Sequence, residues 1–399
     1  MPEPLNDDRA RVAPRPAHHP DDRTAGPDRT RTALRILRPD LVTGFDAALP
    51  GARAAVLSRL LGALDREPLL GITDRRHDAG TLRVVLRDGR HLRAPAAAAE
   101  PFAPSPDGLR AEIDGTGYDD PAVLLRVLAL PGDTRRLVAE IDNSVANLAL
   151  ARAAAPAPHQ RRGPVLRAHE GRADGPGRLE QLVTDGHPLH PCCRTRGGMS
   201  VADVLSYAPE HAPVLRLRRL RVPADRWYGN APPVLLTHPW QTERIRAAYP
   251  FLVPDGESTA VRPLMSLRTV APTDGGEHVK TAVDAQLTSA VRTVSAAALH
   301  NGPVLSALLD TLTADLPTFR VLRERAAGAV VVDGQPHRSL SHLRREAPPT
   351  ADRCWVRSSP ATAATRTPGC ATSPPCCCRH CSPCCTGGSP WRPTARTPW

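Results

Sequence analysis

The chain has 399 residues, enough for two or three domains, and its hydrophobic content of 41% excludes a wholly disordered protein. Aromatic residues contribute only 3% and proline occupies 44 positions, so a buried core must consist mainly of leucine, valine and alanine. The formal net charge is +11, but no basic stretch is interleaved with aromatic residues and no known nucleic-acid-binding module occurs. These features argue against a nucleic-acid partner.

The chain shows no unbroken run of about 18 or more apolar residues, and its first residues are rich in proline and charge. We therefore expect neither a membrane-spanning helix nor a secretory signal. The sequence predicts a cytoplasmic protein with no membrane partner.

Lysine is almost absent. Of the 52 basic residues, all but Lys280 are arginine. Arginine can replace lysine at most surface positions, whereas a site that needs a compact ammonium group does not accept a planar guanidinium. Lys280 is therefore a candidate for such a site, with chance survival of one lysine as the alternative.

The N-terminal part begins with residues 1–32, which mix proline with both signs of charge and predict a disordered leader. The segment 33–153 has the patterns of a globular support domain without obvious chemistry. Within it, residues 54–65 place leucine and valine on one helical face, and an Asp-Gly turn within 81–93 indicates a β-hairpin.

Two more helices are predicted in this domain, over 121–130 and 133–153. The second helix is expected to face inward with four residues: Leu137, Ile141, Val145 and Leu148.

Residues 154–178 are rich in alanine, proline, arginine and glycine and are interpreted as a linker to a second domain at 179–348. A helix is predicted over 286–300, ended by Asn301-Gly302-Pro303, with another helix from Val304. Four strands are predicted before it, over 214–222, 234–238, 263–270 and 278–283, the last two joined by a glycine turn. We therefore predict an α+β fold, with a mixed or antiparallel sheet in the second domain and a support domain of helices and β-hairpins.

Alternate residues on a strand share a face, so Ser266 and Arg268 should point the same way, as should His278 and Lys280. Arg292, with Thr288 one turn before it on the predicted helix, would add a third cation and another hydroxyl. Clustered cations and hydroxyls suit a polyphosphate. The alternative is an ordinary basic strand with a solvated face.

Residues 186–198 read Gly-His-Pro-Leu-His-Pro-Cys-Cys-Arg-Thr-Arg-Gly-Gly. Each proline holds the histidine before it in an extended conformation, which could direct the imidazoles of His187 and His190 into a cleft. A metal site with Cys192 and Cys193 lacks a convincing further ligand, so no metal is expected. From spacing alone, two loop histidines without a ligand are the more common outcome.

The segment 349–399 is compositionally different from the rest. Eight of the 10 cysteines lie between Cys354 and Cys385, and no leucine, isoleucine, phenylalanine or methionine occurs from 350 onward. A soft-metal cluster and a secreted disulfide scaffold are two interpretations. We favour a third, the translation of a GC-rich gene out of frame, which predicts an unfolded tail.

The residues of the second domain resemble the IucA/IucC-type family, the NRPS-independent siderophore synthetases. The family signature Gly-His-Pro-x-His-Pro-x-x-Lys-x-Arg-x-Gly is matched from Gly186 to Gly198, with Arg194 in place of lysine. Five further family motifs follow in order: Tyr207-Ala-Pro-Glu210, His238-Pro-Trp-Gln241, Ser266-Leu-Arg-Thr269, His278-Val-Lys280 and Thr288-Ser-Ala-Val-Arg292. The resemblance covers about residues 130–345.

The resemblance implies an ATP-dependent, AMP-forming ligase that activates a carboxylic acid, such as citrate or a dicarboxylate derivative, as an acyl-adenylate. An amine or hydroxyl nucleophile then displaces AMP, and Mg²⁺ bridges phosphate oxygens. The resemblance also implies a homodimer. It assigns the triphosphate to Ser266, Arg268, Thr269, Lys280 and Thr288.

The same resemblance gives two further residues catalytic roles. His187 would lie at the nucleotide, and Arg292 would lie between the phosphates and the carboxylate. Clustered cations would offset the repulsion of two anions and stabilise the charge that develops at the α-phosphate.

Family members are longer and carry a C-terminal His-x-Gln-Asn motif that does not occur in this chain. We therefore expect a frameshift near residue 350 and an incomplete, inactive copy of such a ligase. The alternative is a non-catalytic remnant that binds ATP or another polyanion.

Overall fold

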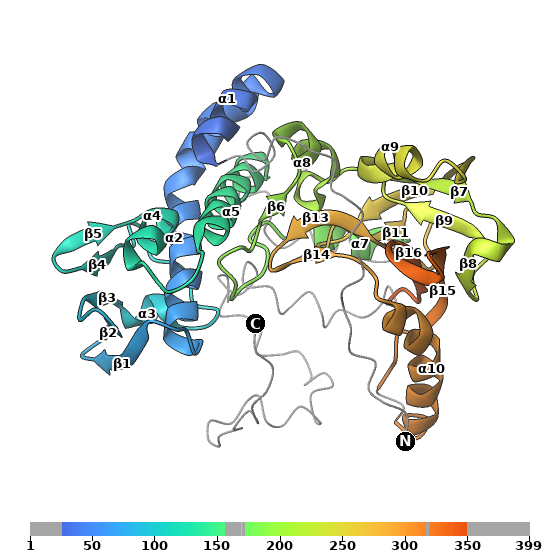
Figure 1. The fold of residues 1–399 in the computed structure, drawn as a ribbon. Helices are drawn as coiled ribbons and strands as arrows, with labels where there is room; N and C mark the ends of the chain where they lie inside the picture. The colour runs from blue at the N-terminus through green and yellow to red at the C-terminus, as the bar shows by residue number, and fades with distance from the viewer. Residues whose placement is uncertain (1–25, 156–168, 170–171, 317–318, 349–399) are drawn as a thin grey trace, which may run out of the picture.

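The computed structural model describes residues 26–155, 169, 172–316 and 319–348. Residues 1–25 of the predicted leader and the cysteine-rich tail from 349 lie outside the described residues. Two parts are visible (Figure 1): N-terminal helices with a small sheet, and a second part built on a larger sheet. Every strand pair is antiparallel, which confirms the predicted α+β class.

The N-terminal part is centred on the long helix α2 (Val42–Arg66), which includes the predicted helix at 54–65. Helix α1 (Pro27–Leu37) and the turn η1 (Pro39–Leu41) precede it, so residues 27–32 of the predicted leader are helical. Helices α4 (Pro121–Leu128) and α5 (Arg135–Ala154) pack on α2 and confirm the two other helices predicted in this domain.

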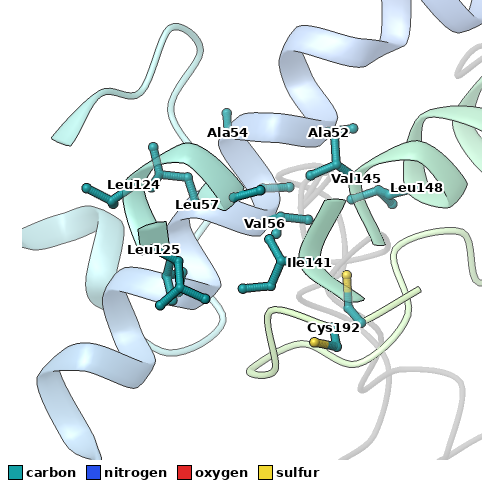
Figure 2. Packing of buried hydrophobic residues seen from close by; sticks show 14 of the residues in the cluster. Ala52, Ala54, Val56, Leu57, Leu124, Leu125, Ile141, Val145, Leu148 and Cys192 are labelled. Carbon is teal, nitrogen blue, oxygen red and sulfur yellow. The ribbon is translucent and has the colours of Figure 1, made fainter. Parts of the chain in front are cut away.

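The core of this part lies where α2, α4 and α5 meet (Figure 2). Val56 and Leu57 of α2 contact the leucines of α4 and the inner face of α5, and Cys192 lies beside them. One predicted core residue is wrong: Leu137 is 37% exposed, whereas Val138 is 7% exposed. The inner face of α5 follows the three- and four-residue spacing from Val138 to Ile141 and Val145, which leaves Leu137 at the edge of that face.

Among the described residues, the segment Pro39–Arg66 is the one helix long and apolar enough, by length and composition alone, to cross a membrane. No unbroken apolar run marks this segment in the sequence, yet the mean hydropathy over its most apolar stretch reaches 1.2. Of that stretch, 61% is buried inside the protein. This degree of burial is that of a central core helix.

The small sheet has the strand order β1-β2-β3-β4-β5 and covers one end of α2. The predicted hairpin is confirmed by the pairing of β2 with β3 around Gly89, whose φ of +87° glycine adopts without strain. Its elements are β1 (Ile72–Asp78), β2 (Thr81–Leu86), β3 (His91–Pro95), α3 (Ala96–Ala99), β4 (Ala111–Ile113) and β5 (Thr116–Tyr118).

The second part contains an eight-stranded sheet in the order β8-β15-β16-β12-β11-β10-β7-β9. Its strands are β7 (Leu215–Arg221), β8 (Trp227–Gly229), β9 (Val234–Thr237), β10 (Val253–Pro263), β11 (Thr269–Pro272), β12 (His278–Thr281), β15 (Glu324–Val332) and β16 (Gln335–Arg345). The hairpin β15–β16 comes last in the sequence but lies between β8 and β12.

A three-stranded sheet in the order β14-β13-β6 connects this part to α5. Its strands are β6 (Arg196–Gly197), β13 (Val283–Leu287) and β14 (Ala290–Arg292). The remaining elements are α7 (Gly175–Gln181), α8 (Val201–Tyr207), η3 (Pro209–His211), η4 (Ala224–Arg226), α9 (Pro239–Ala248) and α10 (Ala296–Leu312).

The helix predicted over 286–300 is wrong in its first half. Residues 283–292 form the hairpin β13–β14, and Thr288 in its turn has a φ of +57°, which a right-handed helix does not allow. The helix that does form, α10, begins after the capping side chain of Ser295, which accepts the N–H of Ala298. It continues through Pro303, so Asn301-Gly302-Pro303 does not end it.

Candidate functional site

A pocket of about 620 Å³ opens where the central strands of the large sheet end. Four residues predicted to bind phosphate line it together: Ser266, Arg268, Thr269 and Lys280. The other lining residues are Glu180, Leu264, Met265, His278, Arg320, Leu322, Arg345, Glu346 and Pro348. Cationic and hydroxyl side chains therefore share the pocket with an apolar wall.

Ser266 and Arg268 lie on a tight turn between β10 and β11, so the strand predicted over 263–270 is interrupted. The buried Leu267 has a φ of +65°, which breaks the alternation of a strand. The turn is closed by the N–H of Thr269, which donates to Ser266 Oγ at 3.2 Å. The side chains of Ser266 and Arg268 both line the pocket. The turn brings them there, and not the alternation of side chains along a strand.

Lys280 lies on β12 directly opposite Thr269 of β11, so their side chains share one face of the sheet. Among the described residues, no hydrogen bond or ion pair occupies the Lys280 ammonium. Burial lowers the pKa of Lys280, and the nearby charges of Arg268 and Arg345 lower it further. A bound anion would stabilise the charged form of this half-buried ammonium.

The guanidinium of Arg268 is half-buried and donates through Nη1 to the backbone oxygen of Thr293 at 2.8 Å. Burial, followed by the charges of Arg292 and Arg345, lowers the pKa of Arg268 to about 10. Within the described chain no carboxylate pairs with it. The pocket thus concentrates positive charge that the described residues only partly neutralise.

Two pocket cations were missed in the sequence analysis, Arg320 and Arg345. Arg345 lies opposite His278 in the pairing of β12 with β16, and its Nη2 donates to Glu324 Oε1 at 3.0 Å. The alternating pattern of 335–345 could have indicated a strand, but its partner strand lies more than 50 residues earlier, so no local signal placed Arg345 beside Lys280.

Arg292 and Thr288 lie outside the lining of this pocket. Arg292 is on β14 and not on a helix, and Thr288 is in the β13–β14 turn. The charge of Arg292 nevertheless lowers the pKa of Arg268, of His187 and of His190. Arg292 is therefore close enough to both the pocket and the His-Pro segment for its charge to act on each, and it lies on a strand where a helix was predicted.

His187 and His190 lie on the segment that precedes β6, with ring centroids 6.2 Å apart and ring planes at 83°. In each ring Nδ1 accepts a backbone N–H two residues later, at 3.3 Å for His187 and 3.0 Å for His190. Burial and nearby charges lower the pKa of both groups, so both are neutral at pH 7. His187 does not line the pocket.

The position where the family signature has lysine is occupied by a buried ion-pair network. Arg194 Nη1 and Arg196 Nη2 donate to the two carboxylate oxygens of Glu210, each at 3.0 Å. Arg194 also donates to the backbone oxygens of Thr184 and Val183. Burial alone would raise the pKa of Glu210, but the two guanidinium groups lower it to about 2. Two family motifs are thus joined through a structural contact.

The His-Pro-Trp-Gln motif is structural as well. His238 is fully buried, and its Nδ1 accepts the N–H of Trp240 at 3.2 Å, which caps α9. Gln241 donates to the backbone oxygen of Ala282 at 2.8 Å and accepts the N–H of Asp284 at 2.9 Å. This motif therefore fixes the connection between β12 and β13.

Across the described part of the chain, no group of three or more histidine, cysteine, aspartate and glutamate side chains could hold a metal ion. Cys192 and Cys193 are buried free thiols. The cysteine cluster considered for a soft metal lies outside the described residues.

The fold and the pocket define a two-part α+β protein with a cationic pocket at its large sheet. The IucA / IucC family model matches residues 177–232 and 230–365. Together with the relatives described next, this match supports the assignment of the chain to the IucA/IucC family.

Staphyloferrin A synthase of Staphylococcus aureus (strain NCTC 8325 / PS 47) is 29% identical over 209 residues, covering 42% of this chain and 36% of that protein. D-ornithine–citrate ligase of the same organism is 22% identical over 196 residues, covering 37% of this chain and 29% of that protein. The chain therefore spans well under half the length of these relatives.

The ATP-bound structure of aerobactin synthetase IucA from a hypervirulent pathotype of Klebsiella pneumoniae has the same fold, with a TM-score of 0.55 and 20% identity. The alignment covers 77% of this chain and 62% of that chain.

Proposed function

We propose that this chain provides the ATP-binding part of a siderophore synthetase, an ATP-dependent carboxylate–amine or carboxylate–alcohol ligase. The observation that carries the proposal is the pocket in which the half-buried Lys280 and Arg268 lie beside the hydroxyls of Ser266 and Thr269. A triphosphate supplies the negative charge and the acceptor oxygens that these groups lack. A relative described as an ATP-bound synthetase supports this assignment.

The proposed reaction has two steps. A carboxylate oxygen of the acid attacks the α-phosphorus of ATP, the bond to the β-phosphate bridge breaks, and pyrophosphate leaves. The amine nitrogen or hydroxyl oxygen of the second substrate then attacks the acyl carbon, AMP leaves, and the nucleophile loses its proton. Citrate or a dicarboxylate derivative is the proposed acid, supported by the name of the D-ornithine–citrate ligase relative.

Arg292 is proposed to act between the two anionic groups, because its charge reaches both Arg268 of the pocket and the neutral imidazole of His187. A cation at this point would reduce the repulsion between the carboxylate and the phosphates. His187, with Nδ1 occupied by a backbone N–H, would present Nε2 toward the reactants. Thr288 remains a proposed contact only.

The described side chains do not gather three metal ligands, so the site fits Mg²⁺ only as an ion that enters with the nucleotide. Phosphate oxygens and water would supply most of its coordination, which is usual for Mg²⁺ with nucleotides. The ion would neutralise charge on the phosphates.

A cytoplasmic location and a homodimer are parts of the same proposal, consistent with a biosynthetic enzyme that uses ATP. The proposal also includes that this 399-residue chain binds ATP without completing the condensation, because the His-x-Gln-Asn motif expected of the family does not occur in its sequence.

The test is ATP binding by isothermal titration calorimetry with Mg²⁺, using the full chain. We expect Lys280→Gln to weaken ATP binding at least tenfold, since a hydrogen bond to a charged group contributes about 1.5–3 kcal/mol. The matched control is Arg246→Gln, because Arg246 is a surface cation on α9 paired with Glu243. Its affinity should stay within about twofold of the unchanged chain.

Pyrophosphate release with citrate then distinguishes the outcomes. Binding that depends on Lys280 without pyrophosphate release supports a non-catalytic ATP-binding chain. Binding with citrate-dependent release shows a working ligase and contradicts inactivity. Absence of ATP binding, or equal affinity of the Lys280→Gln variant, contradicts the proposed site.

A further inference from the structure

Helix α7 (Gly175–Gln181) contacts the turn that carries Ser266 and Arg268. At its start, Asp174 Oδ2 accepts from Arg262 Nε at 3.1 Å, and at its end Gln181 Nε2 donates to the backbone oxygen of Pro263 at 3.3 Å. These contacts fix the last residues of β10. The family motifs include none of these α7 residues.

Glu180 makes the third contact from α7, and this contact reaches into the turn itself. The N–H of Met265 donates to Glu180 Oε2 at 2.8 Å. Glu180 is also the α7 residue that lines the pocket. Its half-buried carboxylate therefore lies both against the turn backbone and at the wall of the proposed phosphate site.

The hydrogen bonds inside the turn explain why this contact matters. The N–H groups of Leu264, Leu267, Arg268 and Thr269 all find acceptors within residues 264–269. The N–H of Met265 is bonded outside the turn, to Glu180 of α7. This N–H belongs to the peptide between Leu264 and Met265, whose carbonyl accepts from Leu267, so the carboxylate connects a hydrogen-bonded peptide of the turn to α7.

We propose that Glu180 is a positioning residue for phosphate binding: by accepting the N–H of Met265 it holds the 264–268 turn so that Ser266 and Arg268 face the pocket. This inference rests on the proposed ATP site. Glu180 acts through the turn, so its hydrogen bond and not its charge is what the site requires.

Substitutions of Glu180 can separate its hydrogen bond to Met265 from its negative charge. A carboxylate, a protonated carboxyl and an amide all offer an oxygen that accepts an N–H, whereas a methyl group does not. Water can replace the lost acceptor at this partly exposed turn, but water does not connect the turn to α7. Glu180→Gln should therefore preserve the position of the turn, and Glu180→Ala should release it.

The experiment measures the dissociation constant of ATP with Mg²⁺ for the full chain and for the variants Glu180→Ala and Glu180→Gln. We expect about a tenfold weaker affinity for the alanine variant and a change of less than threefold for the glutamine variant. Thermal melting of each variant establishes that the measured protein is folded. The matched control is Glu243→Gln, a surface carboxylate paired with Arg246 on α9, which should bind like the unchanged chain.

Three outcomes are distinguishable. A folded Glu180→Ala variant with unchanged affinity overturns the positioning role while leaving the ATP site intact. An equal loss in both variants overturns it too, because charge would then be the property required. If the unchanged chain does not bind ATP, or if Lys280→Gln binds equally well, the proposed function itself fails and this inference falls with it.

Discussion

The buried network around Glu210 makes a quantitative prediction about stability. Glu210→Gln removes the negative charge that compensates the guanidinium groups of Arg194 and Arg196, while keeping the size of the side chain. The side chain of Glu210 is 0% exposed, so water cannot replace the lost charge. Removing one partner of a buried ion pair costs about 3–5 kcal/mol.

The pKa of Glu210 gives a similar free energy for the loss of its charge. Its decrease from 4.5 to about 2 in the folded protein corresponds to about 3 kcal/mol of stabilisation of the charged form. For a unit of 150–250 residues, a loss of this size lowers the melting temperature by about 6–12 °C.

The assay is urea unfolding of the unchanged chain and of Glu210→Gln at pH 7, followed by circular dichroism. The control is Glu243→Gln, whose exposed pair with Arg246 should contribute less than about 1 kcal/mol. A loss below about 1 kcal/mol for Glu210→Gln would refute the reasoning. The unchanged chain should also keep the contribution of Glu210 above pH 4.5 and lose it as the pH falls toward about 2, a decrease that the variant lacks.

Two more predictions concern buried groups. Burial lowers the pKa of His342 from 6.5 to about 4, so the contribution of His342 to stability is complete above pH 6.5 and is lost as the pH falls toward 4. Urea unfolding at pH 7 and at pH 5 should show this loss of stability. The His342→Gln variant should lose less stability between the two pH values. Gln241→Ala should cost about 2–3 kcal/mol, because the backbone oxygen of Ala282 and the N–H of Asp284 lose their partners; a melting temperature equal to that of the unchanged chain would contradict the role of this motif.

Much of the site could be predicted from sequence because its residues are close along the chain. Ser266, Arg268 and Thr269 occupy one turn and the strand after it, and the next strand brings Lys280 opposite Thr269. The predicted strand through Ser266 was wrong, yet the residues meet in one pocket, since a turn of this length leaves few alternatives. Their role in binding ATP stays a prediction.

The features that sequence did not predict, the place of Arg345 in the pocket and the β13–β14 hairpin, depend on contacts between segments far apart in the chain. Arg345 reaches the pocket because β16 pairs with β12, and no local pattern identifies the partner of a strand. Residues 286–292 of the hairpin fall within the helix predicted over 286–300. Pairing of Gln286 with Gly197 of β6 stabilises the strand there, which is a tertiary contact that overrides local propensity.

The position of the hairpin β15–β16 between β8 and β12 also has a consequence for folding during synthesis. Strand β12 leaves the ribosome without its neighbour, and at about 5–20 residues per second β16 follows only after several seconds. During that interval the backbone of β12 is an open sheet edge beside an incomplete pocket, and such edges can pair with other chains. The nascent chain should therefore depend most on chaperones between the synthesis of residues 281 and 345.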